Sequence, residues 1–391
     1  MSGSSLGERL ASTQRATPIV LPPLRLHSLD LARGVAAIAI VLWHWQHFFF
    51  VGLRRAADFR SADFPVHASL ASLYDYGYLA VSLFFTLSGF IFFWLYSGKV
   101  SNGSLSLRVF FIQRISRLLP LHIATLLVVA VAQWAYRSRI GSDFVYPTGG
   151  TYRFVLNGLL LSIADGGDGM SFNGPSWSLS VEMVLYAVFF LYCSATLPRL
   201  VSMIAVAAGS VLIVAHFKET LGVSMASFFA GGTVWAVYNL LLRAKRLTRA
   251  CLAIDIAAIS GWGVALWCAT RGTPGGALLS GLGSSLVITL GLFPLTILAL
   301  ALTETARPAV FARLARTTRL GEISYSAFMI HFPLQLLIML ALSWFGGDAH
   351  VFYSPLSLLV FLAALVGCSL LSHYHFERPA QRWIRSIART D

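Results

Sequence analysis

A histidine inside an otherwise apolar segment is the first residue of this sequence that could do chemistry. His44 follows Arg33 by eleven positions in HSLDLARGVAAIAIVLWHWQHFFF, residues 27–50. Because an α-helix turns about 100° per residue, both side chains lie on one face, about 16 Å apart along the axis. An ionisable group is costly in lipid, so His44 either hydrogen-bonds a neighbouring helix or takes part in proton transfer. His47, one turn later, is expected to lie nearer the outer interface and to reach toward it.

A carboxylate is expected at a similar depth. Glu182 stands five residues after Trp177, which begins another apolar segment, so it lies roughly 8 Å inside the outer interface at helical rise. His44, roughly 16 Å from the inner boundary of a core about 30 Å thick, is within about 6 Å of that depth. A paired carboxylate would fix the histidine tautomer and raise its basicity. The sequence therefore predicts His44 and Glu182 as a catalytic pair.

Two arginines one helical turn apart are candidates for anion binding. Arg114 and Arg117 stand at the start of an apolar segment in FFIQRISRLLPLH, residues 110–122. Their i, i+3 spacing puts them on one helix face, where two guanidinium groups can hold a phosphate through paired hydrogen bonds. Arg33 is expected at the same cytosolic edge. The alternative is that all three are ordinary flanking charges that orient the spans.

A third histidine, His331, falls roughly 12 Å inside its own apolar segment at helical rise. It either lines the same cavity as His44 or makes a hydrogen bond between packed helices, and the second interpretation is preferred. Ser88 and Gly89 are small residues of the kind that let helices approach closely. The other residues expected to line the cavity are Asp30, Trp177, Ser180 and Tyr325.

The elements that must position these residues are membrane-spanning helices. Of the 391 residues, 57% are hydrophobic and 12% are charged, and the mean hydropathy is +0.73. A soluble domain would carry about 25% charged residues. The composition predicts an all-α, polytopic membrane bundle. Ten apolar segments are long enough to span: 31–51, 77–97, 118–136, 177–197, 200–216, 223–242, 251–270, 278–303, 323–345 and 355–376. The apolar patch 154–163 is too short, so it is expected at the interface or as a re-entrant segment.

The distribution of basic residues orients these spans. With ten spans both termini share a side, and 21 of the 29 Lys and Arg residues fall on that side. The positive-inside rule makes this side the cytosol. The net charge of +13 is thereby explained by topology, and nucleic acid is not expected as a partner. The expected organisation is a disordered tail at 1–24, one transmembrane domain at 25–380 and a basic tail at 381–391.

The four cysteines stand at 193, 251, 268 and 368, each in an apolar segment and without CxxC spacing. They are expected to be small buried hydrophobes, with no disulfide or metal role.

Several separated motifs together resemble the acyltransferase-3 family of integral membrane acyltransferases. Their order along residues 28–379 carries the resemblance. Two positions depart from the family pattern: His122 stands where a tyrosine is more usual, and Ser82 where an acidic residue is common. The matching positions are Asp30, Arg33, Gly34 and His44; Phe84, Phe85, Ser88, Gly89 and Phe90; Arg114, Arg117, Leu119 and Pro120; 177–182 with Tyr186; Ser324, Tyr325, Ser326 and His331; and 377–379.

The resemblance implies an enzyme of the plasma (inner) membrane with ten spans. It would move an acyl group, usually acetyl, from cytosolic acyl-CoA to a hydroxyl of a carbohydrate or glycolipid. Acyl-CoA is then a co-substrate, and no tightly bound cofactor or metal is expected. No fused extracytoplasmic domain, found in some relatives, is recognised. The outer loops 52–76 and 137–176 are expected to shape the acceptor site, and neither the acceptor nor the oligomeric state can be read.

The residues and the resemblance agree on roles. Arg33, Arg114 and Arg117 would hold the phosphates of coenzyme A, and His44 would act as general base with Glu182 orienting it. An acyl-histidine intermediate, or a role for Glu182 in acceptor binding, stays open. The rival hypothesis is a proton-coupled transporter or flippase of lipid-linked sugars, in which the same groups relay protons. Transporters are commonly built from internal repeats, and the two halves of this sequence do not match.

Overall fold

The computed structural model describes residues 25–165, 170–195, 199–214, 219–244, 247–270, 286–314 and 319–388. The predicted tail at 1–24 lies outside them. The helices of ten or more residues are α1 (His27–Trp43), α2 (His67–Tyr76), α3 (Ala80–Leu95), α5 (Leu107–Ile140), α7 (Trp177–Ala195), α8 (Leu200–Val214), α9 (Glu219–Arg243), α10 (Leu247–Thr270), α13 (Phe293–Ala306), α16 (Ser324–Phe345), α17 (Pro355–Ser372) and α18 (Arg378–Ile387).

Short elements join these helices. The short α-helices are α4 (Ser97–Ser101), α6 (Gly150–Gly158), α14 (Pro308–Leu314) and α15 (Arg319–Glu322). The 3₁₀ turns are η1 (His44–Phe49), η2 (Ser61–Asp63), η3 (Gly77–Leu79), η4 (Ser162–Asp165), η5 (Gly174–Ser176) and η7 (Ala349–Tyr353). The π-helical turns are η6 (Ile288–Leu292) and η8 (His373–Glu377), and β1 (Phe50–Val51) pairs antiparallel with β2 (Arg54–Arg55).

The all-α, polytopic prediction is confirmed. Among the described residues, nine helical stretches are long and apolar enough to cross a membrane, and the helix at Leu200–Leu212 is apolar but shorter. Each of the ten predicted segments overlaps one of these ten, with the short one matching 200–216. The patch 154–163 forms the end of α6, a turn and the start of η4 instead of a span.

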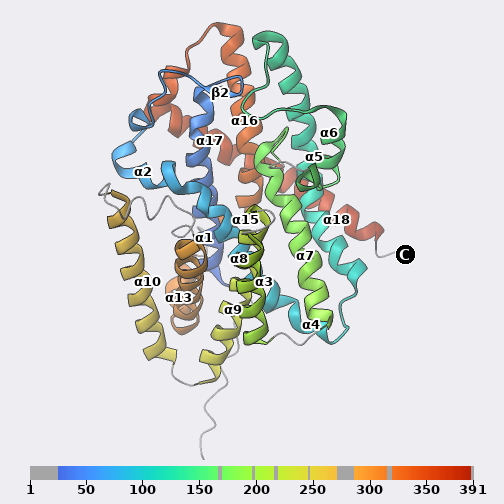
Figure 1. Ribbon diagram of the computed structural model, residues 1–391, viewed down its shortest axis with the longest axis vertical. Helices are drawn as coiled ribbons and strands as arrows, with labels where there is room; N and C mark the ends of the chain where they lie inside the picture. The colour runs from blue at the N-terminus through green and yellow to red at the C-terminus, as the bar shows by residue number, and fades with distance from the viewer. Residues whose placement is uncertain are drawn as a thin grey trace, which may run out of the picture.

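The bundle is organised around α1 and α16, which lie near its centre (Figure 1). α1 packs against α3, α13 and α16, while α16 also packs against α5 and α17. α3 and α9 approach so closely that a Cβ on Gly89 would lie 1.8 Å from the Phe228 carbonyl oxygen. A Cβ on Gly231 would likewise lie 2.0 Å from the Thr86 carbonyl oxygen. The packing role expected for Gly89 is therefore confirmed.

The first span changes its helical type at the predicted catalytic histidine. α1 ends at Trp43, and the chain tightens into the 3₁₀ turn η1, which begins with His44. A 3₁₀ stretch places side chains about 120° apart. His44 and His47 therefore point the same way, because three residues complete one 3₁₀ turn.

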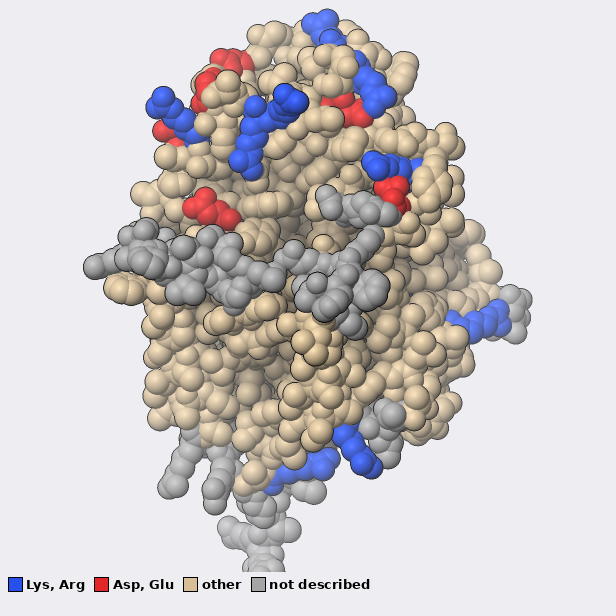
Figure 2. All heavy atoms as spheres, viewed as in Figure 1, with Lys and Arg blue, Asp and Glu red and all other residues tan. Residues whose placement is uncertain are grey.

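The last helix, α18, carries arginines and apolar side chains at the end of the described chain. The predicted boundary at residue 380 falls inside it. Arg385 Nε donates to Ser116 Oγ at 3.1 Å, which ties α18 to α5, and Trp383 is 66% exposed. On the face drawn in Figure 2, the described charged side chains gather mostly at the upper and lower ends, with a broad uncharged band between them. This is the surface expected of a bundle surrounded by lipid.

Candidate active site

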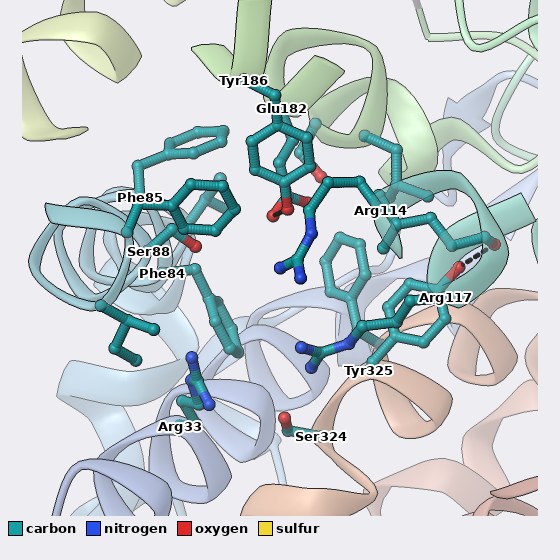
Figure 3. A pocket seen from close by; sticks show the side chains of 17 residues that line it. Arg33, Phe84, Phe85, Ser88, Arg114, Arg117, Glu182, Tyr186, Ser324 and Tyr325 are labelled. Carbon is teal, nitrogen blue, oxygen red and sulfur yellow. Dashed lines mark hydrogen bonds between the residues drawn. The ribbon is translucent and has the colours of Figure 1, made fainter. Parts of the chain in front are cut away.

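A cavity opens between α1, α3, α5, α7 and α16. Arg33 from α1 and the pair Arg114 and Arg117 from α5 all turn their guanidinium groups into it (Figure 3). The predicted meeting of the three arginines is thus found in the structure. The cavity is called the arginine cavity below. Its other lining residues include Phe84, Phe85 and Ser88 of α3, Ser178, Leu179, Glu182 and Tyr186 of α7, and Ser324, Tyr325 and Phe328 of α16.

Aromatic rings hold Arg114 in place. Its Nη2 donates to the Tyr96 hydroxyl at 2.8 Å, and its guanidinium carbon lies 4.8 Å from the Tyr96 ring centre and 5.2 Å from that of Phe92. Its Nε–H is buried without a described partner. Arg33 forms an ion pair with Asp30 at 3.5 Å. Arg114 is therefore fixed by the two rings and the Tyr96 hydroxyl, and it lines the cavity beside Arg33 and Arg117.

Glu182 belongs to the arginine cavity and not to the histidine. Its Oε1 accepts a hydrogen bond from the Tyr186 hydroxyl one turn along α7. No hydrogen bond or ion pair joins it to His44 among the described residues, so the predicted pairing is wrong. A match in depth fixes only the height of two side chains in a membrane, and α7 turns Glu182 toward α3 and α5. Three guanidinium groups facing one carboxylate leave the cavity positively charged.

His44 instead contacts a second histidine. Its Nδ1 lies 3.0 Å from Nε2 of His331, and the two rings stack with centres 4.8 Å apart. His331 Nδ1 in turn lies 2.6 Å from the Phe328 carbonyl oxygen. Both rings are buried, at 5% and 0% exposure. The preferred interpretation of His331, a hydrogen bond between packed helices, is confirmed, and its partner is the candidate base.

His47 is a third member of this cluster. Its Nδ1 lies 3.1 Å from Gln335 Oε1, and its Nε2 lies 3.3 Å from the Tyr146 hydroxyl. Gln335 Nε2 donates to the His44 carbonyl at 2.9 Å. The expectation that His47 reaches the outer interface is wrong, because the loop carrying Tyr146 folds over it and leaves it 3% exposed. Burial raises the pKa of the Tyr146 phenol, which therefore keeps its proton to donate.

Phe328 stands between the arginine cavity and the histidines. Its ring lines the cavity and lies with its centre 5.9 Å from that of His331. Arg33 lies in α1 and His44 begins η1 directly after it, but only Arg33 lines the cavity. The three arginines and the histidine cluster are therefore separate groups, and Phe328 lines the cavity of the first and contacts the second.

Of the remaining residues that were predicted to line the cavity, some line it or an adjoining pocket and others do not. Tyr325 lines the arginine cavity, donates to the Leu118 carbonyl at 2.5 Å, and also lines an adjoining polar pocket that contains Asp30. Trp177 and Ser180 line neither of these two pockets. Ser180 Oγ instead bonds the backbone N–H of Ser162 at 3.0 Å, which fastens η4 to α7. Their neighbours in sequence, Ser178 and Leu179, face the arginine cavity in their place.

Two contributors were missed by the sequence analysis. Gln335 is a polar residue in an apolar helix, four positions after His331, so both lie on one face of α16. The reasoning that selected His44 would have selected it. Tyr146 gave no comparable signal, because it stands in a loop whose path the sequence does not reveal.

The chain belongs to the acyltransferase domain family known as acyltransferase-3, whose family model matches residues 26–374. It is similar to the acyltransferase MdmB of Streptomyces mycarofaciens, with 32% identity over 184 residues, 44% of this chain and 41% of that protein. The matched part thus spans less than half of that relative. Protein 2 in picA locus of Rhizobium radiobacter is 30% identical over 215 residues, 50% of this chain and 96% of that protein. No solved structure matches the chain.

Proposed function

We propose that this protein is a membrane O-acyltransferase that moves an acyl group, normally acetyl, from cytosolic acyl-CoA to a hydroxyl of a carbohydrate or glycolipid. The observation that carries the proposal is the turning of three guanidinium groups into one cavity whose wall, Phe328, contacts the His331–His44 pair. Family membership supports the acyltransferase class. Both termini are proposed to lie in the cytosol, with the protein in the plasma membrane.

The arginine cavity suits the phosphates of an acyl-CoA. Guanidinium groups hold phosphate oxygens through paired hydrogen bonds, and three of them line this cavity. Arg33 and His44 are separated by roughly 16 Å at helical rise, a distance that a pantetheine arm can bridge. The thioester would then lie near Phe328, and the acceptor would approach from the histidine side.

The chemical step then needs one base. His44 takes the proton of the acceptor hydroxyl, and the hydroxyl oxygen attacks the carbonyl carbon of the thioester. The C–S bond breaks as the ester forms, and the thiolate of coenzyme A recovers the proton from the imidazolium. Glu182 has no part in orienting His44 in this scheme. Its proposed role is to offset one of the three cationic charges and to hold Tyr186 at the cavity wall.

We expect His44→Ala to abolish acyl transfer while the protein still folds, because no other described group occupies the position of the base. The measurement is transfer of label from labelled acetyl-CoA to endogenous saccharide or lipid in membranes. Thermal unfolding of the purified variant checks its fold.

His350→Ala is the matched control, since this histidine is exposed in η7 and its described ion pairs are with exposed aspartates. Transfer retained by His44→Ala would contradict the mechanism. A wild-type protein that labels no acceptor but moves a lipid-linked sugar across vesicles would favour the transporter.

A further inference from the structure

We infer that His331 is a positioning residue that fixes the tautomer of His44, so that Nε2 of His44 is the nitrogen that accepts the proton. The inference rests on the proposed function, in which His44 is the base. It is carried by the directions of the hydrogen bonds around the two rings and not by their proximity alone.

The first bond in the chain has only one direction. The Phe328 carbonyl can only accept, so the 2.6 Å contact places the hydrogen on His331 Nδ1. A neutral imidazole carries one N–H, which leaves His331 Nε2 as an acceptor. The 3.0 Å contact to His44 must then be donated by His44 Nδ1–H. His44 Nε2 consequently bears the lone pair.

The opposite direction would require a charged ring. If His331 Nε2 donated to His44, both of its nitrogens would carry hydrogens and the ring would be a buried cation. The groups described around the two rings are the side chains of His47, Phe328 and Trp43 and the carbonyls of Ile40 and Ala327, with the Gln335 amide at the His44 carbonyl. None of them is a carboxylate, so an isolated imidazolium would be costly at rest.

A second chain of hydrogen bonds occupies both ring nitrogens of His47, so His47 does not compete with His44 as the base. Gln335 Nε2 donates to the His44 carbonyl, so its Oε1 must accept from His47 Nδ1–H. His47 Nε2 then accepts from the Tyr146 hydroxyl. Both nitrogens of His47 and of His331 thus have described partners. At His44 the described side-chain hydrogen bond is at Nδ1, and the Ile40 carbonyl, which can only accept, also lies within reach of the ring. A carbonyl favours an N–H on the nitrogen that faces it, and we assign the lone pair of His44 to Nε2.

The role of His331 follows from this order. As the acceptor hydroxyl gives its proton to His44 Nε2, positive charge spreads over the imidazole. The bond from Nδ1–H to His331 then strengthens, because its donor becomes ionised. His331 does the orienting work that a carboxylate does in a Ser–His–Asp triad, but without bringing a charge into the membrane interior.

The experiment compares His331→Leu with His331→Gln. Glutamine can offer an oxygen to His44 Nδ1–H and its amide N–H to the Phe328 carbonyl, so it should preserve the tautomer; leucine can do neither. ¹⁵N NMR of the full-length protein with labelled histidine, with His44 assigned by its loss in His44→Ala, reads the tautomer directly. Acetyl transfer is measured on the same samples across a range of pH.

We expect wild type and His331→Gln to show the Nδ1–H form of His44, and His331→Leu to shift toward Nε2–H. Since Nε2 then no longer accepts a proton, kcat should fall about 10²- to 10⁴-fold in the leucine variant, with recovery in the glutamine variant. Ser343→Ala on the same helix should change neither readout, because its hydroxyl bonds only the α16 backbone.

An Nε2–H tautomer of His44 in the wild type would overturn the inference, as would full activity and an unchanged pH profile in His331→Leu. If the leucine variant does not fold, the tautomer of His44 in the wild type and the activity of the glutamine variant still test the inference. If the wild type transfers no acyl group while His44 shows the Nδ1–H form, the proposed function fails and the tautomer assignment stands.

Discussion

Arg114 is held by geometry as much as by charge. Its guanidinium lies over the rings of Tyr96 and Phe92 and donates to the Tyr96 hydroxyl. A planar guanidinium can stack on a ring and still present donors to a phosphate, whereas a lysine ammonium cannot do both. The side chain is therefore suited to one orientation in the cavity.

We expect Arg114→Lys to raise the KM for acyl-CoA about tenfold, which corresponds to about 1.4 kcal/mol, although the charge is kept. Steady-state kinetics with varied acetyl-CoA measure the effect. Lys99→Ala, an exposed change in α4, serves as the control. A KM equal to that of wild type would mean that Arg114 acts only as a point charge or only in topology.

Glu182 permits a test between the two roles considered for it. If it oriented His44, Glu182→Gln would cause a large fall in kcat. Because the structure joins it to Tyr186 and the arginines, we expect kcat to change less than about tenfold and the KM for acyl-CoA to fall, since one repelling charge is removed. A loss of kcat as large as that of His44→Ala would restore the catalytic pair.

At the scale of elements, α16 connects the two groups of the site. Pro333 has no backbone N–H, which frees the Met329 carbonyl one turn earlier. Asn173 Nδ2 donates to that carbonyl at 3.1 Å and so fastens the segment before α7 to α16. The same turn of α16 carries Phe328 and His331. The carbonyl left free by Pro333 thus joins the segment before α7 to the turn of α16 that carries His331.

The contact of α3 with α9 depends on the absence of side chains. We expect Gly89→Ala to lower the free energy of unfolding by about 2 kcal/mol or more, because its Cβ would meet the Phe228 backbone and force two spans apart. Thermal unfolding in detergent checks this. Gly98→Ala is the matched control, since nothing lies within 4 Å of its Cβ, and alanine should be neutral or stabilising there. Equal melting of the two variants would contradict the close packing.

Most of the spanning helices could be predicted from the sequence, whereas part of the site could not. Apolar runs are long and repeat ten times, so hydropathy alone located the spans and the i, i+3 spacing grouped Arg114 with Arg117. The partner of His44 could not be derived in this way. It depends on how α1, α7 and α16 are rotated about their axes, and rotation is set by packing among many side chains. The 3₁₀ turn at His44, which also turns His47 inward, has no signal in the sequence.

For the whole molecule, the two groups of the site lie toward opposite ends of α1. The beginning of α1 lies by the polar pocket that contains Asp30, Glu322 and Arg378, and its other end leads into the β1–β2 hairpin. The arginine cavity adjoins that pocket, and the histidine cluster lies toward the loops that carry Tyr146 and Asn173. The proposed donor and acceptor would therefore approach along the same helix from its two ends.

The position of Phe328 bears on whether protons could leak across the membrane through this site. A protein that receives one substrate from each side of an energised membrane risks becoming a leak, because each elementary charge that crosses releases about 2.3 kcal/mol per 100 mV. Arginines on one side and hydrogen-bonded histidines on the other would make a ready path for protons if water joined them. The buried ring of Phe328 lines the arginine cavity and packs against His331. In the proposed function, the side chain that the thioester passes would therefore also separate the two groups from each other and limit proton leakage while no substrate is bound.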